Sequence, residues 1–130
     1  MGRSLNVLIL TADDLTRRVC ENGLAISGYN VVTAATGTQA VAHLDARKFD
    51  VLVTDAELGG DIGGLSVARL ARARNPKIDV IYTAASPHRV ADAHKVERAP
   101  CIRAPYSAYQ VSGVIVAMRQ RPGLDLPQAA

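Results

Sequence analysis

The sequence has few aromatic residues: it contains no tryptophan, one phenylalanine and four tyrosines. A chain of 130 residues is long enough to bury a core, and here that core must be built from Val, Leu, Ile and Ala. Such small side chains suit helices that pack closely on a sheet. The scarcity of aromatic residues therefore favours a single α/β domain, and no aromatic residues interleave with the basic ones to stack nucleic-acid bases.

Cysteine is also scarce, and long apolar runs are absent. Cys20 and Cys101 fall in apolar patterns with no second cysteine at metal-ligand spacing, which predicts two buried, reduced thiols. No apolar run approaches about 20 residues, and the N-terminal stretch lacks the pattern of a cleaved signal peptide. We therefore expect no membrane span and a cytoplasmic location.

The net charge is only mildly positive, +3 at pH 7, and the chain has no long basic tract. Basic residues spread in this way are typical of solvated helix faces, so direct nucleic-acid binding is not expected. His43, His88 and His94 lie in predicted helices without ligand spacing to a common site. A histidine metal centre is therefore not expected either.

Five short apolar runs alternate with five segments of helical period, and these predict strands and helices respectively. The predicted strands cover residues 6–10, 30–35, 50–55, 78–84 and 99–106. The predicted helices cover residues 15–26, 36–48, 63–76, 86–97 and 107–121. Residues 1–121 are expected to form one domain, with 122–130 as a flexible C-terminal tail.

Local signals indicate how the helices begin and which side faces the core. Asp13 or Asp14 can cap the first helix, and Thr38 is a candidate cap for the second. Ser86 followed by Pro87 is the preferred start of the fourth helix. The first helix is expected to turn four side chains inward: Leu15, Val19, Cys20 and Leu24.

Strands that are apolar on both faces need cover on both faces, and helical connections between them imply a parallel sheet. The sequence therefore predicts a three-layer α/β/α sandwich of the doubly wound type. In such sheets the functional crevice lies beyond the carboxyl ends of the strands. Asp55 ends the third strand and Thr83 lies near the end of the fourth, so we expect both side chains at this crevice.

Four stretches together resemble the receiver domain of bacterial response regulators, which has a flavodoxin-like fold. They are "VLVTDAELGG…GGL", "VIYTAA", "IRAPY" and "ISGYNVVTAATGTQAV", and the resemblance extends roughly from Leu5 to Gln120. It implies a five-stranded parallel sheet of order 2-1-3-4-5. It also implies that Asp55 is the phosphoacceptor and that Thr83 contacts a phosphoryl oxygen.

The resemblance further implies a role in two-component phosphorelay signalling, as a signalling module rather than an enzyme. The most that such a domain catalyses is phosphoryl transfer to its own aspartate, here Asp55, with Mg²⁺ neutralising the charges that meet. The implied partners are a histidine kinase or phosphotransfer protein and a downstream protein. The downstream partner would dock on the face formed by helix 4, strand 5 and helix 5, through which a homodimer could also form.

The chain departs from the family pattern at the residues that supply charge. Thr11 and Ala12 stand at the positions of the family's acidic pair, and Ala104 stands at the position of its lysine. Arg103 is adjacent, but neighbouring residues of a strand face opposite sides of the sheet. We therefore expect weakened Mg²⁺ binding and impaired phosphorylation.

A weak metal site from other carboxylates is one alternative, formed by Asp13, Asp55 and Glu57. The favoured interpretation makes Asp13 a helix cap and Glu57 an exposed loop acid. The switch region is also altered, because Cys101 stands where the family has an aromatic residue. Pro105 and Tyr106 follow it in the same region.

Three functions compete on this evidence. The first is a receiver that still accepts phosphate on Asp55. The second is a degenerate receiver that acts as a protein-interaction module without phosphorylation. The third is a small flavodoxin-like cofactor binder or enzyme, which is disfavoured because "GGDIGG" does not match a nucleotide-binding loop and the sequence shows no recognisable catalytic pair.

Overall fold

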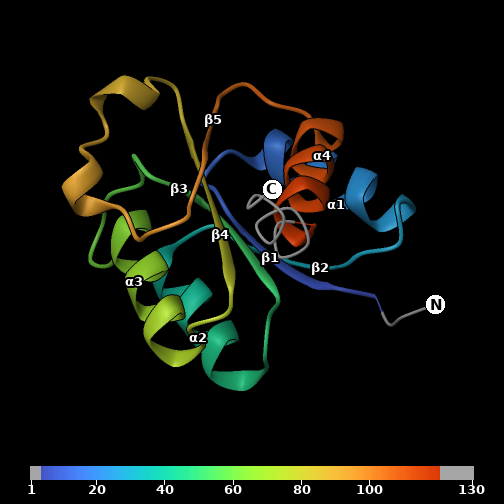
Figure 1. The fold of residues 1–130 in the computed structure, drawn as a ribbon, viewed down its shortest axis with the longest axis horizontal. Coiled ribbons are helices and arrows are strands. Elements are labelled where there is room, and N and C mark those ends of the chain that lie inside the picture. Colours follow the sequence, from blue (N-terminus) through green and yellow to red (C-terminus); the bar gives the residue numbers. More distant parts are fainter. Residues whose placement is uncertain (1–3, 121–130) are drawn as a thin grey trace, which may run out of the picture.

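The structure is a computed structural model that describes residues 4–120. Its five strands form one parallel sheet in the order β2-β1-β3-β4-β5 (Figure 1). The strands are β1 (Asn6–Leu10), β2 (Asn30–Ala34), β3 (Val51–Asp55), β4 (Asp79–Ala84) and β5 (Cys101–Arg103). The predicted fold class and strand order are confirmed.

Within residues 4–120, four α-helices cover the two faces of the sheet. They are α1 (Asp14–Ile26), α2 (Gly37–Ala46), α3 (Gly64–Arg74) and α4 (Ala108–Arg119). Helices α1 and α4 pack together on one face, and α2 and α3 pack together on the other (Figure 1). This is the predicted three-layer arrangement, and in the described residues no helix is long and apolar enough to cross a membrane.

The strands are apolar on both sides because each side has a helical layer to bury. In β1, Val7 and Ile9 belong to the core cluster under α1 and α4, whereas Leu8 and Leu10 belong to the cluster under α2 and α3. All four side chains are fully buried. Successive side chains of the strand point to opposite faces of the sheet and thus fill two separate aliphatic cores.

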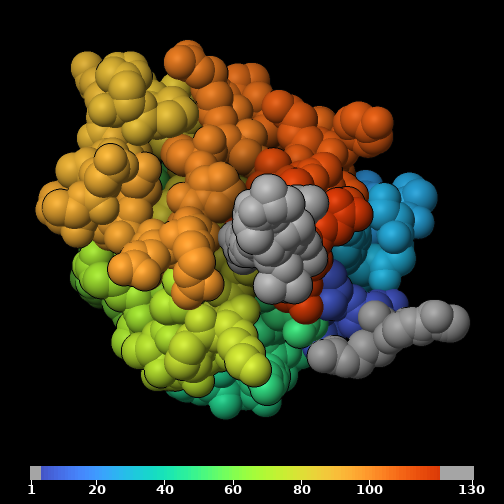
Figure 2. All heavy atoms as spheres, in the orientation of Figure 1, coloured from blue at the N-terminus to red at the C-terminus, as the bar shows by residue number. Residues whose placement is uncertain are grey.

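The predicted helix over residues 86–97 is wrong. The chain forms two single turns of 3₁₀ helix there, η1 (Pro87–Arg89) and η2 (Asp92–His94). Residues 85–100, here called the β4–β5 segment, lie beside α3 at the upper left of the face in Figure 2. The fourth predicted helix is therefore missing from the predicted docking face. This face consists of the β4–β5 segment, β5 and α4, and α4 is the helix predicted as the fifth.

Side chains outside the β4–β5 segment bind its backbone and hold it in this non-α-helical conformation. The guanidinium of Arg69 donates to the carbonyl oxygen of His94 at 3.1 Å. The guanidinium of Arg72 donates to the carbonyl oxygen of Glu97 at 2.8 Å. The N–H of Val96 donates to the hydroxyl oxygen of Tyr82 at 2.9 Å. The N–H of Val96 is thereby used outside any helical ladder, and the two carbonyl oxygens tie the segment to α3.

Two details of helix packing also differ from expectation. Cys20 and Leu24 are buried, but Leu15 is 70% exposed and Val19 is 49% exposed, because α1 turns a narrower stripe to the sheet. The cap of α2 is Thr36, whose hydroxyl accepts from the N–H of Gln39, and not Thr38. The predicted tail at residues 122–130 lies outside the described residues.

Candidate functional site

The loops after β1, β3, β4 and β5 converge on one pocket of about 340 Å³ at the carboxyl ends of the strands. Asp55 and Thr83 thus share one crevice, as expected from the sequence. Of the residues that the resemblance or the metal alternative places at the site or in the switch region, Ala12 and Cys101 are not in the lining. The residues that line the pocket are Thr11, Asp13, Thr16, Asp55, Glu57, Thr83, Ala85, Ala104, Pro105 and Tyr106.

Asp55 ends β3 with its side chain half-buried in this pocket. Its Oδ1 accepts from the backbone N–H of Glu57 at 2.9 Å. Burial raises the pKa of Asp55 above its ordinary value, and the nearby negative charge of Glu57 raises it further, against the opposing effect of that hydrogen bond. The turn that follows Asp55 thus positions its carboxylate. The burial and the nearby charge of Glu57 disfavour the ionised form of Asp55.

Thr83 is the partner of Asp55 in the register of β3 and β4, and it is buried. Its carbonyl oxygen accepts from the N–H of Ala56 at 2.8 Å, which continues the parallel ladder past Asp55. Residues paired across two parallel strands lie side by side. The structure therefore brings Asp55 and Thr83 to the same pocket, as the sequence predicts.

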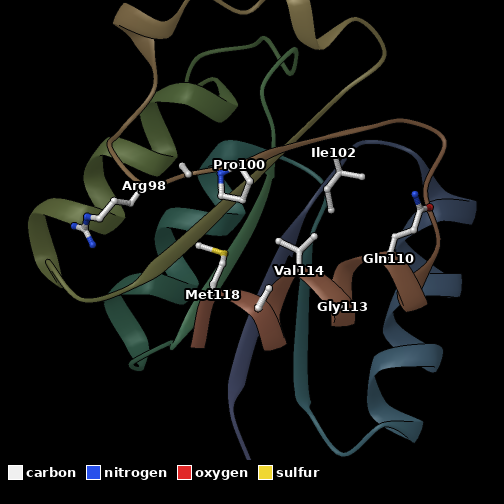
Figure 3. A pocket seen from close by; sticks show the side chains of 9 residues that line it. Arg98, Pro100, Ile102, Gln110, Gly113, Val114 and Met118 are labelled. Atoms are coloured by element: carbon white, nitrogen blue, oxygen red, sulfur yellow. The ribbon is translucent and has the colours of Figure 1, made fainter. Parts of the chain in front are cut away.

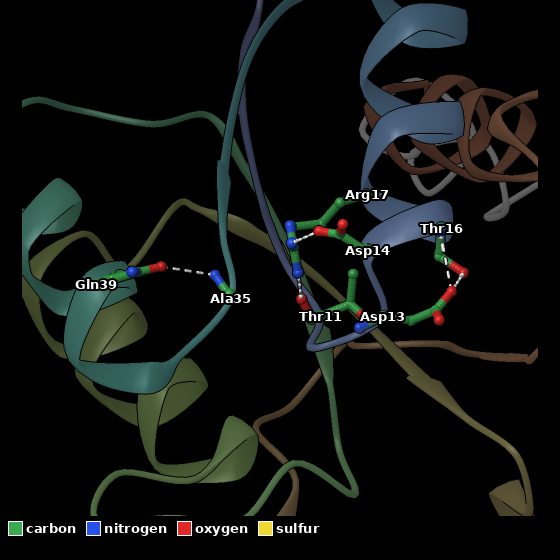
Figure 4. Close-up of polar contacts among 7 residues, drawn as sticks. All are labelled: Thr11, Asp13, Asp14, Thr16, Arg17, Ala35 and Gln39. Carbon is green, nitrogen blue, oxygen red and sulfur yellow. Dashed lines mark hydrogen bonds and ion pairs between the residues drawn. The ribbon is translucent and has the colours of Figure 1, made fainter.

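The turn after β1 uses its carboxylate to begin a helix. Asp13 is the N-cap of α1, and its side chain accepts from the backbone N–H of Thr16 at 2.9 Å and from the Thr16 hydroxyl (Figure 4). These two hydrogen bonds lower the pKa of Asp13. Thr11 is buried, and its hydroxyl oxygen accepts from the N–H of Asp13 at 3.2 Å. The interpretation of Asp13 as a helix cap is confirmed.

Arg17 is a residue that the sequence analysis did not single out. Its guanidinium donates to the backbone carbonyl oxygen of Thr11 at 2.8 Å and forms an ion pair with Asp14 (Figure 4). The cation therefore holds the end of β1 and is not among the residues that line the pocket. Nothing in the sequence distinguishes this arginine from the other basic residues of the helices.

Glu57 is more than the exposed loop acid expected from the sequence. Its Oε1 accepts from the backbone N–H of Ala85 at 2.6 Å, and its Oε2 lies 3.4 Å from the N–H of Ser86. These contacts join the loop after β3 to the start of the β4–β5 segment. The sequence carries no signal for them, because the groups that Glu57 binds are backbone donors.

The turn after β5 places Ala104 and Pro105 in the pocket wall, joined by a cis peptide bond. Arg103 is exposed and is not among the lining residues. Cys101 pairs with Tyr82 in the register of β4 and β5 and packs under α2 and α3. Both Cys101 and Cys20 are free thiols, and burial raises the pKa of each.

Tyr106 directs a buried hydroxyl into the same region. Among the described residues this hydroxyl has no hydrogen-bond partner of standard geometry. Burial raises the pKa of Tyr106 to about 12, although the nearby Thr83 side chain acts in the opposite direction. The ring itself packs in the core under α1 and α4.

The glycine-rich loop between β3 and α3 has a structural explanation. Gly60 has a φ of +97°, in the left-handed region that glycine adopts most readily. Gly64 approaches the end of β3 so closely that a Cβ atom would lie 1.8 Å from the carbonyl oxygen of Asp55. These positions need glycine for the turn and for close packing, with no phosphate required.

The charge in the pocket is negative. Asp13, Asp55 and Glu57 contribute three carboxylates, and none of the described lining residues carries a positive side chain. The carboxylate of Asp13 is occupied with Thr16 and that of Glu57 with backbone N–H groups. Among residues 4–120, no group of three or more His, Cys, Asp or Glu side chains is arranged to hold a metal ion.

Comparison with known proteins agrees with the fold. The model of the response regulator receiver domain family matches residues 7–102. The probable transcriptional regulatory protein TcrX of Mycobacterium tuberculosis is 30% identical over 84 residues, which are 65% of this chain and 36% of that protein. A cyclic di-GMP phosphodiesterase of Thermotoga maritima is 35% identical over 81 residues, 62% of this chain and 21% of that protein. The matches thus span little more than a third of these relatives at most.

Solved structures share the fold at lower sequence identity. A response regulator receiver protein of Sinorhizobium medicae has a TM-score of 0.79 at 20% identity, covering 88% of this chain and 94% of the other. The response regulator protein TrrA of Thermotoga maritima, solved in complex with Mg²⁺–BeF, has a TM-score of 0.74 at 20% identity, with 88% and 98% coverage. Since the family model covers most of the sequence and the sheet order agrees, this chain belongs to the response regulator receiver domain family of two-component signalling proteins.

Proposed function

We propose that this receiver domain presents Asp55 as its phosphoacceptor position and that Mg²⁺-dependent phosphorylation of Asp55 is impaired. The observation that supports this most is the absence of any positive side chain among the described residues that line the pocket. Receiver domains in general bind Mg²⁺, as TrrA does in its complex. Here Thr11, Ala12 and Ala104 stand where carboxylates and an ammonium group would be expected.

The impairment follows from the charges that must meet. In phosphoryl transfer, an Asp55 oxygen forms a bond to phosphorus while the bond from phosphorus to the donor's imidazole nitrogen breaks, and that nitrogen keeps the electron pair. The incoming phosphoryl group is anionic and approaches three carboxylates. An oriented group that stabilises such charge contributes about 10²–10³ in rate, so the loss of several should slow the reaction severely.

Beyond this self-phosphorylation we propose no enzymatic activity. Receiver domains interact with histidine kinases and with downstream proteins. For this chain we propose a histidine kinase or phosphotransfer protein as the donor. The downstream partner would dock on the face built from the β4–β5 segment, β5 and α4.

The experiment compares the chain with a variant in which the family's charges are restored: Thr11→Asp, Ala12→Asp and Ala104→Lys together. Both proteins are incubated with Mg²⁺ and acetyl phosphate, and the gain of one phosphoryl group is followed by mass spectrometry. The restored variant should react at least about 10²-fold faster. Asp55→Ala in each background serves as the control that identifies the acceptor. Equal rates in the two proteins would contradict the proposal.

A second candidate function is a protein-interaction module that works without phosphorylation, and one surface feature favours it. A groove of about 800 Å³ runs between β5 and α4, with Ile102, Val114 and Met118 in its lining (Figure 3). Nearly all of its surface is apolar, and Arg98 and Gln110 lie at its ends. If partner binding at this face is unaffected by Asp55→Ala and by the restored charges, the interaction function is the better description.

A further inference from the structure

Glu57 joins two loops that are far apart in the sequence. Its carboxylate accepts from the N–H of Ala85, 28 residues away, at 2.6 Å, and lies 3.4 Å from the N–H of Ser86. Both donors belong to the first residues after β4, where the chain leaves the sheet. Because their ladder partners have ended, these N–H groups need another acceptor, and Glu57 supplies one.

The backbone of Glu57 is fixed at the same time. Its N–H donates to Oδ1 of Asp55 at 2.9 Å, and the carbonyl oxygen of Asp55 accepts from the N–H of Leu58 at 3.2 Å. The side chain of Glu57 therefore extends from a turn that is itself hydrogen-bonded. A carboxylate held by a fixed backbone can set the position of the donors that it binds.

The far part of the β4–β5 segment is already held by Arg69, Arg72 and Tyr82, at residues 94–97. The contacts of Glu57 hold its near end. The segment is thus secured at both ends by side chains that lie outside it. The acceptor at the near end is a permanent part of the chain and requires no ligand or modification.

We propose that Glu57 is a positioning residue that clamps the start of the β4–β5 segment in one arrangement, independently of the charge on Asp55. This inference goes beyond the proposed function and does not require Asp55 to be phosphorylated. A carboxylate suits the role because both of its oxygens accept. A glutamine would keep one accepting oxygen and would present an NH₂ group, a donor, at the second position.

Amide hydrogen exchange of the full ¹⁵N-labelled chain tests the clamp. In Glu57→Ala the amides of Ala85 and Ser86 should exchange about 10- to 100-fold faster than in the unmodified chain, because a charged acceptor is lost. In Glu57→Gln only one of the two amides should be released. Asp61→Ala, which removes an exposed acid of the same loop, is the matched control and should leave both amides unchanged.

The same spectra show whether each variant is folded, since the amides of Val53 and Ile81 in the buried strands report the core. Asp55→Asn tests independence from charge and should leave the exchange of Ala85 and Ser86 as it is in the unmodified chain. Unchanged exchange in Glu57→Ala and Glu57→Gln, or faster exchange in Asp55→Asn, would overturn the inference. Neither result depends on the rate of phosphorylation, so this proposal and the proposed function can fail separately.

Discussion

Gly64 and Asp55 are in direct contact: a Cβ atom on residue 64 would lie 1.8 Å from the carbonyl oxygen of Asp55. The contact is reinforced by Thr54, whose hydroxyl donates to the carbonyl oxygen of Gly64 at 3.1 Å. The first turn of α3 is therefore pressed against the end of β3. This packing fixes the backbone from which the Asp55 carboxylate projects into the pocket.

The first prediction concerns this contact. Gly64→Ala should lower the free energy of unfolding by about 1–3 kcal/mol, because the added methyl group forces the backbone apart. Gly113→Ala is the matched control, since it lies in α4 with open space around its Cβ position. It should leave the free energy unchanged or raise it by up to about 1 kcal/mol through helix propensity. Urea denaturation measures both, and equal effects would contradict the explanation.

A second prediction contrasts two buried tyrosine hydroxyls. The Tyr82 hydroxyl accepts from the N–H of Val96, whereas the Tyr106 hydroxyl has no partner of standard geometry among the described residues. Tyr82→Phe should lower the free energy of unfolding by about 1–3 kcal/mol, because a backbone donor loses its acceptor. Tyr106→Phe should be neutral or stabilising. The same denaturation measurement decides, and the reverse order of stabilities would show that the hydrogen bonding is assigned wrongly.

The third prediction is the alkaline behaviour of Tyr106. Its pKa in the folded chain is about 12, above the ordinary value of 10.0. The folded state holds this proton more tightly than the unfolded state does. The contribution of the protonated Tyr106 to the free energy of unfolding is therefore fully present below pH 10 and is lost as the pH rises towards 12. When tyrosinate formation is followed by ultraviolet absorbance, the ionisation with the highest pKa should be absent in Tyr106→Phe. If that ionisation persists, the assignment of the raised pKa is wrong.

The fourth prediction concerns the charge on Asp55, whose pKa is raised mainly by burial. A raised folded pKa means that the protonated form is favoured on folding, so ionisation above that pKa opposes folding. Asp55→Asn keeps an oxygen that can accept from Glu57 and removes the charge. It should therefore be more stable than the unmodified chain at neutral pH, with the difference shrinking as the pH falls towards 3.8. A constant difference across this range would exclude the electrostatic cause.

The strands and the pocket were predictable because each rests on a local pattern. The run at Asn6–Leu10 is apolar on both faces and matches β1 residue for residue. The ends of parallel strands share one edge, so the positions of Asp55 and Thr83 followed from topology. The cap at Asp13 was predictable for the same reason, since it depends only on neighbours within three residues.

Two of the failures involve contacts between distant residues. The segment after β4 has a good helix start at Ser86 and Pro87, yet it forms only two 3₁₀ turns, and Arg69, Arg72 and Tyr82 bind its backbone. No periodicity encodes such contacts. The link from Glu57 to Ala85 escaped prediction in the same way, since the recognised group is an amide that every residue but proline carries.

The way in which the β4–β5 segment is held has a consequence for its evolution. Its anchors bind main-chain atoms, so the side chains at positions such as His88, Arg89 and Ala91 contribute little to keeping it in place. These positions can diverge freely while the path of the chain is preserved. A library randomised at these positions should yield mostly folded proteins. New binding specificity can therefore evolve in this segment without loss of the fold.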